Sequence, residues 1–163
     1  MAEKHIFISL GSNLGNRLDN LTKALISLEA EDIRVLVISA IYETLPWGFE
    51  SNSFYNACAQ LETTMTPIQL LKILLRVEEK LGRVRNSEEG YSARIIDLDI
   101  LSFDDLIINS PLLTLPHPRL HLRNFVLVPL SQIAPSWKHP LLKKSISTLI
   151  YESPDKALSN PFP

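Results

Sequence analysis

Residues 66–101 read TPIQLLKILLRVEEKLGRVRNSEEGYSARIIDLDIL, which predicts a helix, a polar loop and a strand. Thr66 and Gln69 form the pattern of a capping box, with Pro67 at the first helical position. The expected helix carries four apolar residues at helical spacing: Leu70, Leu74, Val77 and Leu81. It ends at Gly82, a residue type that is common directly after a helix. After a polar loop at 83–93, the run RIIDLDIL at 94–101 alternates as a strand does.

Similar patterns extend toward the N-terminus. Residues 5–10 alternate as a strand, 17–30 have helical period, and 33–42 are β-branched and strand-like. Residues 53–63 alternate again. The order is therefore β-α-β-β-α-β, the ferredoxin-like arrangement of an α+β fold. Right-handed crossovers place both helices on one face of a mainly antiparallel sheet and leave the other face free for a site.

The C-terminal third is marked by proline, since nine of the eleven prolines lie between 111 and 163. Short helices are expected near 125–133 and 145–151, and this Pro-rich segment should cover part of the second face. We expect a single domain over 1–163, with a βαββαβ core at about 4–102 and a covering segment at about 103–163.

Composition excludes several classes of protein. The 163 residues are 45% hydrophobic and 21% charged with a net charge of −2, which argues against a disordered chain and against a nucleic-acid or membrane-surface binder driven by bulk charge. The single cysteine, Cys58, permits no intramolecular disulfide and no multi-cysteine metal site. No signal peptide or membrane span is evident, so we expect a cytoplasmic monomer.

Asp97 and Asp99 lie two positions apart on the last predicted strand, so their side chains should share a face with Cα atoms ~6–7 Å apart. Adjacent like charges are unfavourable unless a cation lies between them, and hard carboxylate oxygens suit Mg²⁺. One or two metal ions could bind there. The alternative is the solvated polar face of a half-exposed strand.

An arginine cluster accompanies this pair. Between residues 81 and 137 the chain has no lysine but five arginines, with His117 and His121 among them: Arg83, Arg85, Arg94, Arg119 and Arg123. Guanidinium groups bind phosphate oxygens bidentately. Acids beside arginines are what a polyphosphate with Mg²⁺ requires, although surface ion pairing also explains them.

Two further segments are candidates for ligand contacts. YETLPWG at 42–48, followed by Phe54 and Asn56, offers aromatic faces and an amide to a flat heteroaromatic ligand, or simply anchors a turn. GSNLG at 11–15 is similar to a phosphate loop but lacks the Gly-Lys-Ser/Thr ending, and a glycine-bounded turn with an Asn helix cap explains it equally well.

Five blocks in this order resemble the 6-hydroxymethyl-7,8-dihydropterin pyrophosphokinase family of folate biosynthesis: GSNLG, YETLPWG, GRVR at 82–85, RIIDLDIL and LPHPRLHLRNFVLVPL at 115–130. The resemblance covers about residues 4–140 and implies the βαββαβ fold. It implies transfer of pyrophosphate from ATP to the pterin hydroxymethyl group, with AMP released.

The resemblance also implies site residues. Asp97 and Asp99 would hold two Mg²⁺ ions and, with Arg83 and Arg94, form the catalytic set. ATP would contact six residues: Glu78, Arg85, Ile100, Thr114, His117 and Arg123. The pterin would contact another six, with Phe54 and Phe125 on its two faces and Asn56 on its amide edge: Thr44, Trp47, Phe54, Asn56, Tyr91 and Phe125.

Some positions depart from the family pattern. Tyr91 stands where some members have tryptophan, Leu112 where some have arginine, and Phe54 where some have tyrosine. The loop at 83–93 is about one residue longer and is expected to close over the substrates as a lid, with Gly90 as a hinge. None of these changes removes a predicted metal ligand.

Two other functions remain as alternatives. A catalytically silent ferredoxin-like module that binds a small ligand would share the topology but has no need of the aspartates and arginines. A two-metal phosphohydrolase would use the acids but not the pocket formed by Thr44–Asn56.

Overall fold

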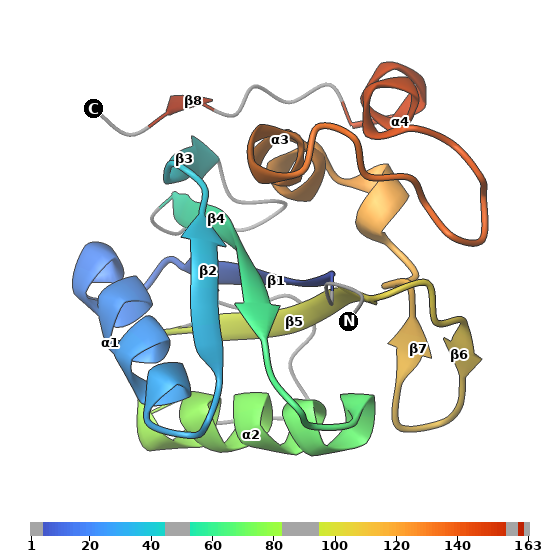
Figure 1. Cartoon of the computed structure of the whole chain (residues 1–163). Helices are drawn as coiled ribbons and strands as arrows, with labels where there is room; N and C mark the ends of the chain where they lie inside the picture. The colour runs from blue at the N-terminus through green and yellow to red at the C-terminus, as the bar shows by residue number, and fades with distance from the viewer. Residues whose placement is uncertain (1–4, 45–52, 83–94, 156–159, 162–163) are drawn as a thin grey trace.

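The computed structural model describes residues 5–44, 53–82, 95–155 and 160–161. These residues form an α+β fold with an antiparallel sheet and four α-helices (Figure 1). The strands of the main sheet are β1 (Ile6–Ser12), β2 (Arg34–Ile38), β3 (Tyr42–Thr44), β4 (Phe54–Glu62), β5 (Asp97–Phe103) and β8 (Asn160–Pro161). The helices are α1 (Arg17–Glu29), α2 (Pro67–Lys80), α3 (Asn124–Ile133) and α4 (Ile146–Glu152). The remaining elements are a hairpin of β6 (Ile108–Asn109) and β7 (Thr114–Leu115) and a 3-10 turn at Leu120–Leu122.

The strand order is β5-β1-β4-β3-β8, and β2 also pairs with β4. Every neighbouring pair is antiparallel. This confirms the predicted βαββαβ order, with β1 central between β4 and the strand that carries the aspartates. The expected strand at 94–101 is observed as Asp97–Phe103.

The prediction of one strand over 33–42 is wrong, because the segment is divided into β2 and β3. Between them, Ser39 Oγ accepts a hydrogen bond from Cys58 N at 2.9 Å, and Gln132 Oε1 accepts one from Ala40 N at 2.9 Å. A side chain from the same segment and another from α3 thus take over bonds that a continuous ladder would make.

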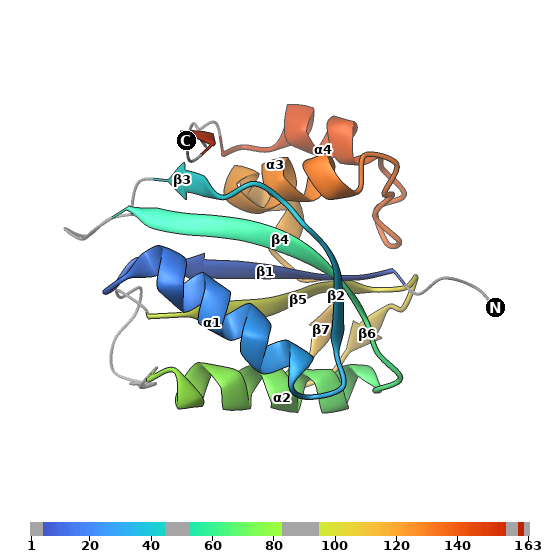
Figure 2. The same cartoon turned by 60° about the vertical axis from the view of Figure 1, so that its left-hand side comes forward.

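Both N-terminal helices cover one face of the sheet, as predicted (Figure 2). Thr66 and Gln69 form the expected capping box, and Gly82 follows α2 with φ of 102°. The side chains that α1 and α2 bury meet those that β1, β4 and β5 turn toward them. The core on this face is formed mainly by Ile6, Ile8, Leu10, Leu28, Leu61, Leu70, Leu74, Ile96, Leu98 and Ile100.

The C-terminal segment covers part of the other face, where α3 and α4 lie over the sheet (Figure 2). Phe7, Cys58 and Leu101 point toward this side and pack against residues of the 3-10 turn and the two helices: Leu120, Val126, Leu127, Leu130, Ile146 and Leu149. The two short helices predicted near 125–133 and 145–151 are therefore confirmed as α3 and α4. None of the helices in the described part of the chain combines the length and the apolar character that crossing a membrane requires.

Candidate functional site

A row of register partners crosses the sheet near one end of the face that carries α3. Tyr42 pairs with Asn56, Asn56 with Gly11, and Gly11 with Asp97. Directly opposed residues of neighbouring strands share a face, so all four lie on the same side of the sheet. Gly11 contributes no side chain to the row, and it lies between the amide of Asn56 and the carboxylate of Asp97.

Asp97 and Asp99 both lie on this face, each half-buried, while Leu98 between them is buried among the core residues on the helix side. Asp99 pairs with Ser9, and Asp97 with Gly11. This confirms that the two aspartates share a face and that Ile96, Leu98 and Ile100 point into the core. Two carboxylates held side by side by strand geometry can offer oxygen ligands to a divalent cation.

Asn56 is buried and has a fixed orientation. Its Nδ2 donates to Thr44 Oγ1 at 2.8 Å, and both side chains are less than one-tenth exposed. Its Oδ1 lies over Gly11, where a Cβ would come within 2.9 Å of that oxygen and 3.7 Å of Cδ1 of Phe54. Three of the predicted pterin contacts, Thr44, Phe54 and Asn56, are therefore brought together beside Gly11.

His117 lies in the segment that follows β7, near enough to Asp97 for its pKa to respond to that charge. Its backbone N–H donates to the Leu101 carbonyl at 2.8 Å, which fixes this segment to β5. Burial and, to a smaller extent, the positive charges of Arg123 and Arg119 lower the pKa of His117 to about 4, although the negative charge of Asp97 acts in the opposite direction. Its Nδ1 accepts a hydrogen bond from Arg119 N at 3.1 Å, so the neutral ring carries its proton on Nε2.

Two predicted ATP contacts, Glu78 and Ile100, have their side chains buried on the helix side of the sheet, not on the face that carries the aspartates. Glu78 lies on α2 and is only 1% exposed, and its Oε2 accepts a hydrogen bond from Leu98 N at 2.8 Å. The Ile100 side chain is buried in the core under the helices. Because Leu98 N–H bonds to α2, it points away from β1. Backbone groups two residues apart in a strand point the same way, so those of Ile100 face the same outer edge.

Thr114 and Phe125 lie on two further elements. Thr114 is half-buried in the β6–β7 hairpin, where it pairs with Asn109. Phe125 is at the start of α3 and packs against the core on that side, with the guanidinium of Arg123 5.4 Å from the centroid of its ring. The remaining predicted site residues lie outside the described residues: Trp47, Arg83, Arg85, Tyr91 and Arg94.

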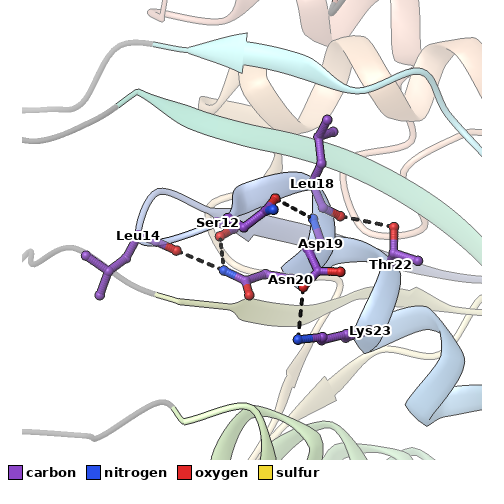
Figure 3. A network of polar contacts seen from close by, with 8 residues as sticks. Ser12, Leu14, Leu18, Asp19, Asn20, Thr22 and Lys23 are labelled. Atoms are coloured by element: carbon purple, nitrogen blue, oxygen red, sulfur yellow. Dashed lines mark hydrogen bonds and ion pairs between the residues drawn. The ribbon is translucent and has the colours of Figure 1, made fainter.

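The GSNLG segment has a structural explanation. Gly11 and Ser12 belong to β1, Gly15 has φ of 71°, and Asn16 caps α1 through Asp19 N. Asn20 then donates to Ser12 Oγ at 3.2 Å and to the Leu14 carbonyl at 2.8 Å, which ties the segment to the first turns of α1 (Figure 3). These contacts favour the turn with an Asn cap over a phosphate loop.

Gly11 is a candidate site residue that the sequence analysis did not identify as such. Its signal was present, because an isolated glycine in a strand often marks a close approach of another group. The strand pattern of 5–10 ended one residue too early to include it.

Comparisons with known proteins identify a family. The model of 7,8-dihydro-6-hydroxymethylpterin-pyrophosphokinase (HPPK) matches residues 7–135. A 2-amino-4-hydroxy-6-hydroxymethyldihydropteridine pyrophosphokinase of Porphyromonas gingivalis is 45% identical over 83% of this chain and 93% of its own length. Its counterpart in Aquifex aeolicus is 37% identical over 86% and 87%.

Longer proteins match as well. The folic acid synthesis protein fol1 of Pneumocystis carinii is 42% identical over 88% of this chain, which spans only 19% of that protein. The wild-type HPPK-DHPS crystal structure from Plasmodium falciparum has a TM-score of 0.71 at 16% identity and covers 92% of this chain. The chain spans 45% of that structure, and this likeness concerns the fold alone.

Proposed function

The chain belongs to the 7,8-dihydro-6-hydroxymethylpterin-pyrophosphokinase family and has the pyrophosphokinase activity of folate biosynthesis, and we propose that its reaction takes place over Gly11. There the pyrophosphoryl group of ATP is transferred to the hydroxymethyl group of 6-hydroxymethyl-7,8-dihydropterin, and AMP is released. The observation that carries this proposal is the row of register partners Asn56, Gly11 and Asp97.

The spacing of that row suits the two substrates. Neighbouring strands are ~4.8 Å apart, so Asn56 and Asp97 are separated by about 10 Å across Gly11. A pterin bound at Asn56 thus has its hydroxymethyl group directed toward a triphosphate bound near Asp97. The missing side chain at Gly11 allows Asn56 Oδ1 and the Phe54 ring to lie close to this strand.

Asp97 and Asp99 fit Mg²⁺, since two half-buried carboxylates present hard oxygen donors on the same face of one strand. These two residues would hold two ions, which neutralise phosphate charge and polarise the phosphorus when bound. The pairing of β5 with β1 keeps both carboxylates on this face before any ligand binds.

The pterin pocket uses Asn56 and Thr44 for recognition. One N–H of Asn56 Nδ2 is donated to Thr44 Oγ1, which fixes the orientation of the amide, and its Oδ1 accepts from a ring N–H. Phe54 and Phe125 supply aromatic faces, and Trp47 and Tyr91 are proposed contacts from segments outside the described residues. A flat ring buried between aromatic faces also excludes water.

The ATP side is basic. Neutral His117 offers its Nε2–H as a donor to phosphate oxygens, and Arg123 lies close enough to lower the pKa of His117. We assign Arg83, Arg85 and Arg94 to the triphosphate, with Arg83 and Arg94 acting in catalysis. Thr114 and the outward backbone groups of Ile100 contribute to nucleotide binding, and Glu78 acts near the same edge.

The chemical step requires little covalent work from the protein. The pterin hydroxyl oxygen attacks the β-phosphorus of ATP, and the bond from that phosphorus to the oxygen shared with the α-phosphate breaks. AMP leaves with the electron pair of that bond, and the hydroxyl proton is released to solvent. Asn56 and the aromatic side chains orient the hydroxyl group. Arginines and His117 stabilise charge on the phosphate oxygens, and a preorganised set of donors of this kind accounts for much of the rate of phosphoryl transfer.

The whole chain acts as one domain in this proposal, with a core at about 4–102 and a covering segment at about 103–163. The packing of α3 and α4 on the sheet supports it. We further propose a cytoplasmic monomer, which gel filtration at assay concentration would test.

Product analysis tests the function. The protein is incubated with ATP, Mg²⁺ and 6-hydroxymethyl-7,8-dihydropterin, and nucleotides and pterins are separated by chromatography. We expect AMP and a pterin pyrophosphate in equal amounts. Formation of ADP, or of free phosphate without pterin modification, would exclude the proposed reaction.

A further inference from the structure

Glu78 is a buried carboxylate on the apolar face of α2. It is 1% exposed, and its neighbours on that face, Leu74 and Val77, are core residues. Burial of a carboxylate is strongly unfavourable unless hydrogen bonds compensate it. The helix already packs on the sheet through aliphatic side chains, so packing alone does not require an acid at this position.

The carboxylate is directed at the backbone of the strand that carries the aspartates. Glu78 Oε2 accepts from Leu98 N at 2.8 Å, and Leu98 lies between Asp97 and Asp99. β5 is at the edge of the sheet in the described residues, with β1 as its neighbour. Leu98 N–H therefore points outward, where no further strand accepts it, and a charged acceptor from α2 takes that place.

This bond constrains both aspartates at once. Leu98 has its side chain in the core and its N–H on Glu78, so its peptide plane is fixed from two directions. Asp97 and Asp99 are each joined to Leu98 by a peptide bond, so the conformation of Leu98 affects the positions of both. Rotation of that backbone would change the separation of the two carboxylates.

We propose that Glu78 is a positioning residue that holds β5 through Leu98 N–H and so sets the spacing of Asp97 and Asp99 for the metal–nucleotide complex. This inference rests on the proposed function. It assigns Glu78 an effect through the strand, without contact to the nucleotide. Its loss should weaken the Mg²⁺-dependent part of nucleotide binding and leave the pterin pocket intact.

The test compares Glu78→Met, which removes the acceptor at similar size, with Glu78→Gln, which keeps an oxygen acceptor without the charge. Glu79→Met is the matched control, because Glu79 is the exposed neighbour on the same helix. Ile73→Val is the control for stability, since Ile73 is buried in the core on the same face without a bond to Leu98.

Two quantities are measured in the intact protein. Calorimetry with a non-hydrolysable ATP analogue over a series of Mg²⁺ concentrations gives the Mg²⁺ midpoint of nucleotide binding. Hydrogen exchange of the Leu98 amide is followed in metal-free protein. We expect Glu78→Met to raise the midpoint at least about fivefold and to accelerate Leu98 exchange. Glu78→Gln should shift both in the same direction by a smaller factor, and both controls should leave the midpoint unchanged.

An unchanged Mg²⁺ midpoint in Glu78→Met, or the same shift in Ile73→Val at equal stability, would overturn the proposal. If Glu78→Met does not fold, Glu78→Gln decides, and faster Leu98 exchange with an unchanged midpoint would refute the positioning role. Pterin binding measured without nucleotide should stay at the wild-type value in both variants. Failure of the wild-type protein to form AMP would instead refute the proposed function.

Discussion

Gly11 and Asn56 are register partners in neighbouring strands, and a Cβ on Gly11 would lie 2.9 Å from Asn56 Oδ1. Carbon and oxygen cannot approach so closely without displacement of one of them. Asn56 cannot rotate freely, because its Nδ2 donates to Thr44 Oγ1 at 2.8 Å. The position of the Asn56 oxygen therefore depends on the absence of a side chain at position 11.

The first prediction concerns Gly11→Ala. The new methyl group should push Asn56 Oδ1 out of place and weaken pterin binding by about tenfold, the effect of losing about one good hydrogen bond. Calorimetry with pterin alone measures this. Gly15→Ala is the control, since its Cβ would meet only Asn20 Nδ2 at 3.9 Å, although φ of 71° strains it. Equal pterin affinity in wild type and Gly11→Ala would show that Asn56 does not bind the ring.

The second prediction separates Asn56 from its partner. Asn56→Ala should raise the pterin dissociation constant by about tenfold or more, because an unpaired buried ring edge costs ~1–3 kcal/mol. Thr44→Val, which keeps the shape but removes the acceptor of Asn56 Nδ2, should have a smaller effect in the same direction. ATP-analogue binding is measured in parallel. If ATP binding weakens as much as pterin binding, Asn56 supports the scaffold and is not a pterin contact.

The third prediction concerns the aspartates. Asp97→Ala and Asp99→Ala should each lose most turnover while the fold persists, because removing one of two adjacent negative charges relieves repulsion in metal-free protein. Thermal unfolding in EDTA should therefore give midpoints equal to or above that of the wild type. A large loss of metal-free stability would show that the pair has a structural role.

The fourth prediction is a loss of stability in mild acid. Burial, together with the nearby His121, lowers the pKa of His139 to about 4, and the pKa of His117 is lowered to a similar value. His139 is 3% exposed, and its Nδ1 accepts from Leu141 N and Leu142 N, so the folded state holds the neutral ring. These groups contribute stability that is fully present above about pH 6.5 and is lost as pH falls toward 4.

The size of the His139 contribution is measurable. The loss of this pH-dependent contribution of His139 should make the free energy of unfolding about 1–3 kcal/mol lower at pH 4 than at pH 7. His139→Asn, whose Oδ1 can replace Nδ1 as the acceptor, should show a smaller slope between pH 6.5 and pH 4 in urea unfolding. A slope equal to that of the wild type would assign the acid sensitivity to other groups.

The sequence predicted the shared face of Asp97 and Asp99 because strand alternation is geometric and both neighbours of Leu98 obey it. The helix caps at Thr66 and Gly82 were also predictable, because they depend only on residues close in the sequence. The break between β2 and β3 was not, because it depends on Gln132, which is 92 positions from Ala40.

The role of Glu78 was only partly visible. Its spacing from Leu74 and Leu81 puts it near the apolar face of the helix, which is unusual for an acid. What it bonds to could not be read from that spacing, because the partner is a backbone group of another element. A buried acid in an apolar stripe is nonetheless a signal that can be searched for.

The central place of β1 also has a consequence for the order in which the protein can be assembled. At one end of the β1–β5 ladder, His5 N donates to Asp104 Oδ1 and Asp104 N donates to the His5 carbonyl, both at 2.8 Å, between residues 99 positions apart. Such distant pairing forms late, after the closure of a long loop. During synthesis the ribosome delivers Gly11 and Asn56 well before the aspartates. The nascent chain can therefore pair β1 with β4 before β5 has been made. Both substrate sites wait for later residues, because Phe125 of the proposed pterin pocket and His117 of the nucleotide side follow the last core strand.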